Sequence, residues 1–212
     1  MKTTFKLFNF LGAPVEISLW FFLLFLMTSV STTIAIFLSV LIHEMAHAYI
    51  AHRRGWKVFG IKLDFLFGTA KLDMSMPEKD SIPVVVAGPL SNLIFAIFVF
   101  ILIDLFYMLG FYLDPVISQF LNTLLFVNII LFIFNLLPIY PLDGGRIVRD
   151  FLVLKMRNQR QMAIRIASII SLIFSVLLLI YSIFSVSILL IFFSVLFIYT
   201  AVKELQSLKN QI

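Results

Sequence analysis

Long apolar runs dominate this sequence and restrict it to folds that can sit in a lipid bilayer. A helix needs about 20 apolar residues to cross the hydrocarbon layer, and 62% of the 212 residues are apolar while only 13% are charged. We expect about six membrane-spanning helices, at roughly 17–30, 33–52, 82–108, 117–137, 162–181 and 184–202. The chain is therefore predicted to be an all-α polytopic membrane protein, with residues 1–212 forming a single membrane-embedded domain.

The stretch between the second and third runs has a different pattern. From Trp56 to Asp73, apolar and polar residues partly alternate and glycines interrupt them. A period of two residues is typical of strands. We expect a β-hairpin or small sheet at the membrane surface over 56–73, with a further strand within Gly12–Ser18.

The positive charges sort to one side of the predicted spans. All 16 Lys and Arg residues fall before the first span or after the second, fourth and sixth spans. Because cytoplasmic loops carry the excess of Lys and Arg, both termini are expected to be cytoplasmic. The net charge of +5 is thus explained by orientation in the lipid bilayer, and no nucleic acid partner is predicted.

The sequence contains no cysteine and only three histidines, so a metal site must use His, Asp or Glu ligands. His43 and His47 lie in the second span with Glu44 as the pattern H-E-x-x-H. Helical residues four apart share a face, so both imidazoles can reach one ion, while Glu44 can face its water without binding the metal. Titratable groups inside a bilayer are costly and usually functional. We therefore predict a zinc (Zn²⁺) site, with His52 outside it at the surface.

A catalytic zinc needs a third protein ligand and one open position. Asp143 stands at the inner end of the fourth span, at the depth expected for the histidine pair. Asp104 should lie near the opposite end of the third span, and Glu16 precedes the first span. Asp150 falls in a basic segment, where an ion pair is expected. Asp143 is therefore the best third ligand on geometry alone.

The run from Asn135 to Gly144 reads N-x-x-P-x-x-x-L-D-G, and the two prolines and two glycines between Asn135 and Arg146 interrupt the end of the fourth span. Together with residues 43–47 it resembles the site-2 protease family of intramembrane metalloproteases, whose two hallmark motifs both stand intact here. Gly88 to Asn92 is similar to a third family element, G-P-x-x-N. The double glycine is similar to the branch that contains the sporulation pro-sigma-factor processing protease.

The resemblance implies that the zinc ligands are His43, His47 and Asp143. It implies that Glu44 is the catalytic acid and base, and that Asn135 lies near the substrate, where it helps to hold the backbone or the oxyanion. Asn92 is expected to be structural, with a place in the lining of the same cavity as the alternative.

The same resemblance implies a function and a location. The reaction would be hydrolysis of peptide bonds in membrane-anchored or membrane-associated proteins and peptides, known as regulated intramembrane proteolysis, in a bacterial cell membrane. No PDZ or CBS regulatory domain is expected. The physiological substrate, oligomeric state and regulatory membrane subunits are left unspecified.

Two other classes of function stay open. One is a catalytically inactive metal-binding membrane protein, although metal binding alone does not need a carboxylate at Glu44. The other is a proton-coupled transporter using buried carboxylates, which explains neither the histidine pair nor the run from Asn135 to Gly144. For a protease, the 56–73 hairpin offers strand edges that could capture an extended substrate, and we state this role as a hypothesis.

Overall fold

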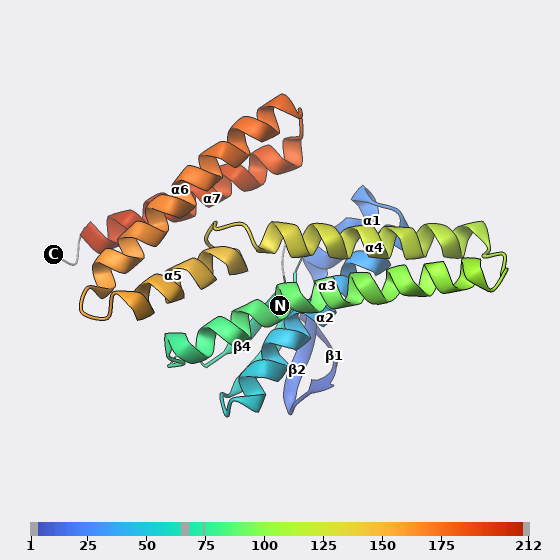
Figure 1. Ribbon diagram of the computed structural model, residues 1–212, viewed down its shortest axis with the longest axis horizontal. Helices are drawn as coiled ribbons and strands as arrows, with labels where there is room; N and C mark the ends of the chain where they lie inside the picture. Colours follow the sequence, from blue (N-terminus) through green and yellow to red (C-terminus); the bar gives the residue numbers. More distant parts are fainter. Residues whose placement is uncertain (1–3, 65–67, 74, 210–212) are drawn as a thin grey trace. The chain divides into compact units, whose positions relative to one another are not determined.

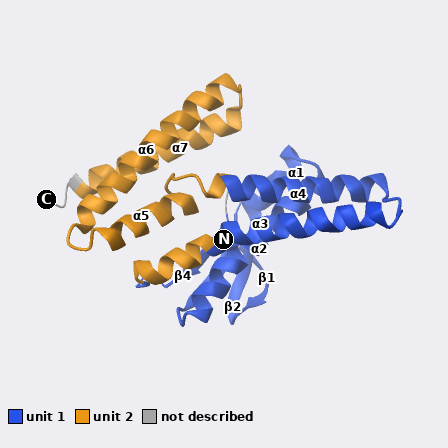
Figure 2. Cartoon of the chain, in the orientation of Figure 1, with its two compact units in different colours: residues 1–76, 87–133 blue, residues 77–86, 134–212 orange. Residues whose placement is uncertain are grey.

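The computed structural model describes residues 4–64, 68–73 and 75–209 (Figure 1). Its elements in chain order are β1 (Thr4–Phe10), β2 (Ala13–Ser18), the 3₁₀ helix η1 (Leu19–Leu23), α1 (Leu24–Met27), α2 (Val30–Arg53), β3 (Val58–Leu63), β4 (Gly68–Leu72), α3 (Glu78–Met108), α4 (Pro115–Asn135), α5 (Asp143–Lys155), α6 (Arg160–Phe184) and α7 (Ile188–Lys209). The chain divides into two compact units (Figure 2): unit 1 comprises residues 1–76 and 87–133, and unit 2 comprises residues 77–86 and 134–212.

Among the described residues, five helices are long and apolar enough to cross a membrane, namely α2, α3, α4, α6 and α7. The predicted class, a helical polytopic protein with a small sheet, is confirmed. The first expected span, 17–30, is the exception, because its residues divide among the end of β2, η1 and the four-residue α1. Ile17 at the start of this segment is buried in β2, whereas most of the large side chains from Leu19 to Met27 are exposed. Only the start of the predicted span therefore belongs to the sheet core.

The sheet of unit 1 has the strand order β1-β2-β3-β4. Strands β2 and β3 pair in parallel, while the two outer pairs are antiparallel. The hairpin expected over 56–73 is therefore confirmed as the antiparallel pair β3 and β4, and residues 65–67 between these strands lie outside the described residues. Strand β1 was not expected. A core of buried residues joins the sheet to α2: Val15, Ile17, Phe21, Ala48, Ile61 and Leu63.

Helix α2 carries the H-E-x-x-H motif between two well-formed caps. Ser29 caps its start by accepting a hydrogen bond from the Thr32 N–H at 3.1 Å. At its end Gly55 adopts φ +84°, and the Trp56 N–H donates to the Ala51 carbonyl at 3.0 Å. This closing turn needs the left-handed conformation that glycine adopts without strain. Buried residues recur every four positions along one face of α2: Ala35, Ser39, His43, His47 and Ala51.

Unit 2 contains α5, α6 and α7, with α6 and α7 packed side by side (Figure 1). Buried serines lie in these two helices, including Ser171, Ser175 and Ser194, and such small side chains allow close approach of membrane helices. Helix α5 was not expected, because its segment is amphipathic and too polar to register as a span.

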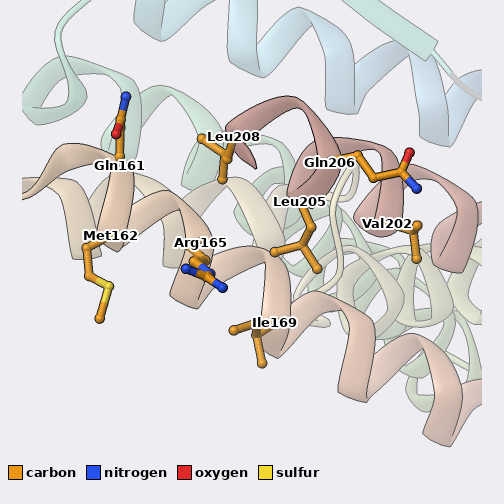
Figure 3. Close-up of a pocket in the computed structure, with 8 residues that line it drawn as sticks. All are labelled: Gln161, Met162, Arg165, Ile169, Val202, Leu205, Gln206 and Leu208. Carbon is orange, nitrogen blue, oxygen red and sulfur yellow. The ribbon is translucent and has the colours of Figure 1, made fainter. Parts of the chain in front are cut away.

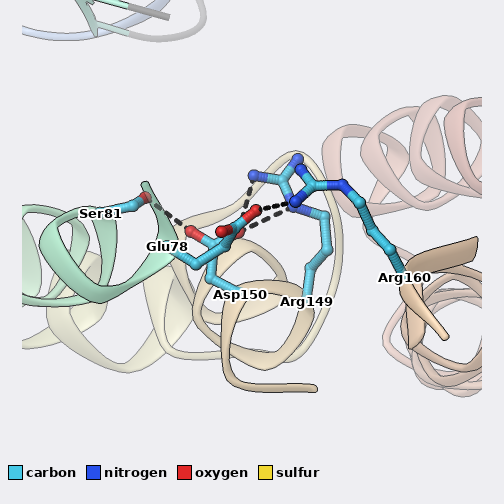
Figure 4. A network of polar contacts seen from close by, with 5 residues as sticks. All are labelled: Glu78, Ser81, Arg149, Asp150 and Arg160. Carbon is cyan, nitrogen blue, oxygen red and sulfur yellow. Dashed lines mark hydrogen bonds and ion pairs between the residues drawn. The ribbon is translucent and has the colours of Figure 1, made fainter. Parts of the chain in front are cut away.

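Polar contacts in unit 2 connect the start of α3 with α5 and with the start of α6 (Figure 4). Asp150 of α5 accepts a hydrogen bond from Ser81 Oγ at 2.6 Å and forms an ion pair with Arg149 at 2.9 Å. Glu78 at the start of α3 pairs with Arg160 at the start of α6. The ion pair expected for Asp150 is therefore confirmed.

A groove in unit 2 runs between the beginning of α6 and the end of α7 (Figure 3). Its polar lining residues are Gln161, Arg165 and Gln206, and the rest are apolar. Its described lining residues include no His, Asp or Glu, which are the ligand types that a metal centre in this protein requires.

Candidate metal centre

The two motif histidines converge inside unit 1. The Nε2 atoms of His43 and His47 lie 3.1 Å apart, and both side chains are buried. Two nitrogens that bind one zinc at 2.0–2.1 Å in tetrahedral geometry would be separated by about 3.3–3.4 Å. The histidine pair therefore fits a single zinc ion with only a small adjustment.

Helix α3 approaches the same imidazoles with two residues that are four positions apart and so share a face. A Cβ placed on Gly88 would lie 2.3 Å from Nε2 of His47 and 2.6 Å from Nε2 of His43. No side chain fits there, so glycine leaves the space beside the nitrogens open. One turn further on, Asn92 Oδ1 lies 2.6 Å from the other ring nitrogen of His43, Nδ1.

Glu44 faces the sheet. Its Oε2 accepts a hydrogen bond from the backbone N–H of Ala70 in β4 at 2.6 Å, and the carboxylate is buried. The close approach is possible because Gly68 has no side chain: a Cβ there would lie 2.7 Å from Oε1 of Glu44. Glu44 thus stands next to the two histidines in sequence while its carboxylate contacts the edge strand.

Asn135 and Asp143 belong to unit 2, at the two ends of one turn. Asn135 is the last residue of α4 and Asp143 the first of α5, where its side chain is buried. The turn folds tightly onto α5, because a Cβ on Gly144 would lie 2.3 Å from the backbone oxygen of Leu136 and one on Gly145 would lie 2.4 Å from the backbone of Ile139. Gly144, which ends the motif, and the following Gly145 are therefore both needed for this packing.

Neighbouring helices satisfy the irregular backbone of this turn. The Tyr140 N–H donates to Ser171 Oγ of α6 at 2.9 Å, and Thr200 Oγ1 of α7 donates to the Tyr140 carbonyl at 3.2 Å. Non-helical backbone at membrane depth requires such internal partners. The turn between Asn135 and Asp143 is therefore held in place by hydrogen bonds to both α6 and α7.

The other acids and the third histidine have different surroundings. Asp104 is exposed and lies about 18 Å along α3 from Asn92, at 1.5 Å per residue. Glu16 pairs across the sheet with Lys6 on β1 and Lys62 on β3. His52 is exposed near the end of α2, as expected.

The chain is similar to known proteins in both sequence and structure. The model of peptidase family M50 matches residues 31–114 and 110–181, a region that contains every predicted site residue. Zinc metalloprotease MJ0392 of Methanocaldococcus jannaschii is 32% identical over 164 residues, covering 72% of this chain and 46% of that protein. Stage IV sporulation protein FB of Bacillus subtilis is 32% identical over 148 residues, covering 68% of this chain and 48% of that protein. The chain thus spans about half the length of these two relatives.

A solved structure is similar over almost the whole chain. The site-2 protease from Methanocaldococcus jannaschii superposes with a TM-score of 0.69 and 30% identity, covering 95% of each chain. The five membrane-length helices and the buried histidine pair define the class, a polytopic membrane protein with a candidate metal site. The chain belongs to peptidase family M50, the site-2 protease family, and the resemblance read from its motifs is confirmed.

Two features of the site were not anticipated from the sequence. The hydrogen bond that Asn92 Oδ1 accepts from the His43 ring had a signal in the sequence, since Gly88 and Asn92 share one face of a helix. The hydrogen bond from the Ala70 N–H to Glu44 could not be predicted from the sequence, because every residue except proline has a backbone N–H and the residue type therefore does not indicate which one donates.

Proposed function

We propose that this protein is an intramembrane zinc metalloprotease that hydrolyses peptide bonds of membrane-anchored or membrane-associated substrates. The observation that carries the proposal is the pair of buried Nε2 atoms, 3.1 Å apart, in a helix of membrane-spanning length that also presents Glu44. Membership of a peptidase family and relatives named zinc metalloproteases support the choice of metal and reaction.

His43 and His47 supply two zinc ligands, and Asp143 supplies the third. Asp143 is favoured because the alternatives are otherwise engaged or remote: Asp150 is held by Arg149 and Ser81, and Asp104 is exposed more than three turns from Asn92. A carboxylate with two imidazoles is an established ligand set of catalytic zinc sites, which leave the fourth position open.

When bound, zinc supplies a Lewis acid for the attacking water and for the scissile carbonyl, and lowers the pKa of that water toward ~7. Glu44 accepts the proton of the water as it attacks and passes it to the leaving amine. Among the described residues the Glu44 carboxylate accepts a hydrogen bond from the Ala70 N–H, and by releasing it Glu44 can turn toward the reacting atoms. Asn135 holds the substrate backbone or the developing oxyanion beside Asp143.

Strand β4 presents the substrate in extended form. It ends the described sheet, and the Ala70 N–H points from it toward Glu44 and so away from β3. A helical substrate hides its amide bonds, so it must unwind before cleavage. An unwound segment that pairs with this edge gains backbone hydrogen bonds and lies next to Glu44.

The proposal extends to location and architecture. The chain acts as one metalloprotease domain in a bacterial cell membrane with both termini in the cytoplasm, as the distribution of Lys and Arg favours. Its substrates are membrane proteins or peptides, and the sequence motifs specify neither their identity nor any regulatory subunit.

The test is a cleavage assay in liposomes. The purified protein is reconstituted with a synthetic single-span peptide that carries a helix-breaking Asn-Pro pair, and products are identified by mass spectrometry. We expect about one zinc per chain, cleavage within the peptide, loss of cleavage with a zinc chelator, and recovery on adding zinc. Zinc binding without cleavage of a panel of such peptides would favour an inactive metal-binding protein. Cleavage that persists in the metal-free protein would contradict the metalloprotease mechanism.

A further inference from the structure

A closed chain of hydrogen bonds connects three membrane-length helices of unit 1 to the histidine pair. It consists of Ser39 in α2, Asn92 in α3 and Asn128 in α4, and none of these side chains has any exposed surface. Polar groups buried at membrane depth are costly unless every donor and acceptor finds a partner. The orientation of each amide can therefore be worked out from its partners.

Two backbone carbonyls fix both amides, because a carbonyl oxygen can only accept. The Ser39 carbonyl lies 3.2 Å from one atom of Asn92, which must be Nδ2, and the Leu124 carbonyl lies 2.8 Å from Nδ2 of Asn128. The remaining contacts agree: Asn92 Nδ2 donates to Asn128 Oδ1 at 2.8 Å, and Asn128 Nδ2 donates to Ser39 Oγ at 2.8 Å. Ser39 Oγ in turn donates to the Ala35 carbonyl at 2.7 Å.

This arrangement leaves only Oδ1 of Asn92 to face Nδ1 of His43, at 2.6 Å. Since Oδ1 is an acceptor, Nδ1 must carry the proton, and the neutral imidazole then has its lone pair on Nε2. That is the nitrogen 3.1 Å from Nε2 of His47. The network thus presents His43 with the nitrogen lone pair that a metal needs.

We propose that Asn92 is a positioning residue: held by Asn128 and Ser39, it selects the Nδ1–H tautomer and the ring orientation of His43 and so raises the affinity of the site for zinc. The inference rests on the proposed function and deepens it. The competing explanation is that the network only holds α2, α3 and α4 together, as any satisfied buried polar network does. Under that explanation, metal affinity would change only in step with fold stability.

Two substitutions at position 92 separate these explanations. Asn92→Leu has a similar volume and no acceptor, so we expect its zinc affinity to fall about 10–100-fold, the usual cost of losing an outer-shell partner. Asn92→Asp keeps an oxygen that accepts from Nδ1–H in either protonation state, so its affinity should stay within about threefold of wild type. Its second oxygen faces the acceptors of Ser39 and Asn128, so its metal-free thermal midpoint should be no higher than that of Asn92→Leu.

Zinc affinity is measured by competition with a chromogenic chelator, and stability is measured on the metal-free protein. Asn122→Leu is the matched control, because Asn122 is exposed on α4 and its amide donates to the Ser118 carbonyl. This control should bind zinc like wild type. The inference is overturned if Asn92→Leu binds within threefold of wild type, if Asn92→Asp binds as weakly as Asn92→Leu, or if the control loses as much affinity.

A measurement on the unaltered protein covers the case in which a variant does not fold. With only three histidines in the chain, ¹⁵N-histidine NMR of the zinc-loaded protein can assign each ring. We expect His43 to be protonated at Nδ1, and a His43 ring protonated at Nε2 would overturn the inference. Zinc binding by wild type without peptide cleavage would contradict the proposed function alone. Normal cleavage by wild type with full zinc affinity in Asn92→Leu would contradict this inference alone.

Discussion

At the scale of single residues, Glu44 differs from its neighbours in the motif by what it contacts. The histidines turn their Nε2 atoms toward each other, while the Glu44 carboxylate accepts a hydrogen bond from a strand amide. On one helix, the two imidazoles thus face each other while the carboxylate faces a strand. Such an arrangement suits two metal ligands beside a carboxylate that carries a proton without binding the metal.

The first prediction concerns that proton carrier. Glu44→Gln is nearly isosteric and can still accept the Ala70 N–H, but its amide cannot take a proton from water. We expect unchanged zinc content and thermal midpoint, with peptide cleavage reduced by about 10²–10⁴, as measured by product formation in liposomes. Activity within about tenfold of wild type would remove Glu44 from its role as general base.

The second prediction concerns the third ligand. Asp143→Asn replaces a carboxylate by a neutral amide, which is a poor zinc ligand, so we expect a loss of zinc affinity larger than about 100-fold together with loss of cleavage. Asp104→Asn is the matched control and should bind zinc normally, since Asp104 is exposed. Wild-type zinc affinity in Asp143→Asn would show that another acid completes the site.

At the scale of elements, strand β4 connects the sheet to α2 through the hydrogen bond between Ala70 and Glu44. Its pairing partner among the described strands is β3, and its other edge presents the Ala70 N–H to Glu44. Edge strands tolerate proline where the N–H does not belong to the ladder. A proline at position 70 therefore removes a hydrogen-bond donor from the free edge of β4 without removing a hydrogen bond between β3 and β4.

The third prediction is that Ala70→Pro weakens substrate capture. Removing one backbone hydrogen bond costs about 0.5–1.5 kcal/mol, which corresponds to a KM for the membrane peptide about 2–10-fold higher. Zinc content should be unchanged. Ala70→Ser keeps the N–H and should behave like wild type, so equal KM values for the two variants would mean that substrate does not pair with β4.

At the scale of the whole molecule, the path of the first thirty residues decides the topology. Five described helices have the length and composition of spans, and an odd number of crossings would put the termini on opposite sides. Residues Ala13–Met27 combine extended, 3₁₀ and α backbone. At about 3.3, 2.0 and 1.5 Å per residue they could cover about 36 Å if collinear, enough for one more crossing.

The fourth prediction is therefore that both termini lie in the cytoplasm. Reporter fusions before Met1 and after Ile212, at positions outside the described residues, should both report the cytoplasmic side, in line with the distribution of Lys and Arg. A C-terminal fusion active outside the cytoplasm would show that Ala13–Met27 stays at one surface.

Much of this protein could be predicted from local patterns. Hydropathy located the five long helices, because a membrane span is a property of about 20 consecutive residues. Alternation located β3 and β4. The spacing of His43, Glu44 and His47 and the run from Asn135 to Gly144 identified the family, because each motif is a local constraint. Hydropathy did not reveal that 17–30 is not one helix, because Ile17 and Ser18 end strand β2 and the residues after them form η1 and α1.

The sequence by itself determined which parts are present: the membrane helices, a pair of histidines on one helical face, and several acidic residues that are candidates for the third ligand. What only the tertiary structure decided is which atoms meet. Asn92 reaches His43 from another helix, 49 positions along the chain, and Ala70 reaches Glu44 through its backbone. The physical reason is that hydrogen-bond partners in a bilayer are chosen by the packing of whole helices and strands, which no local window of residues contains.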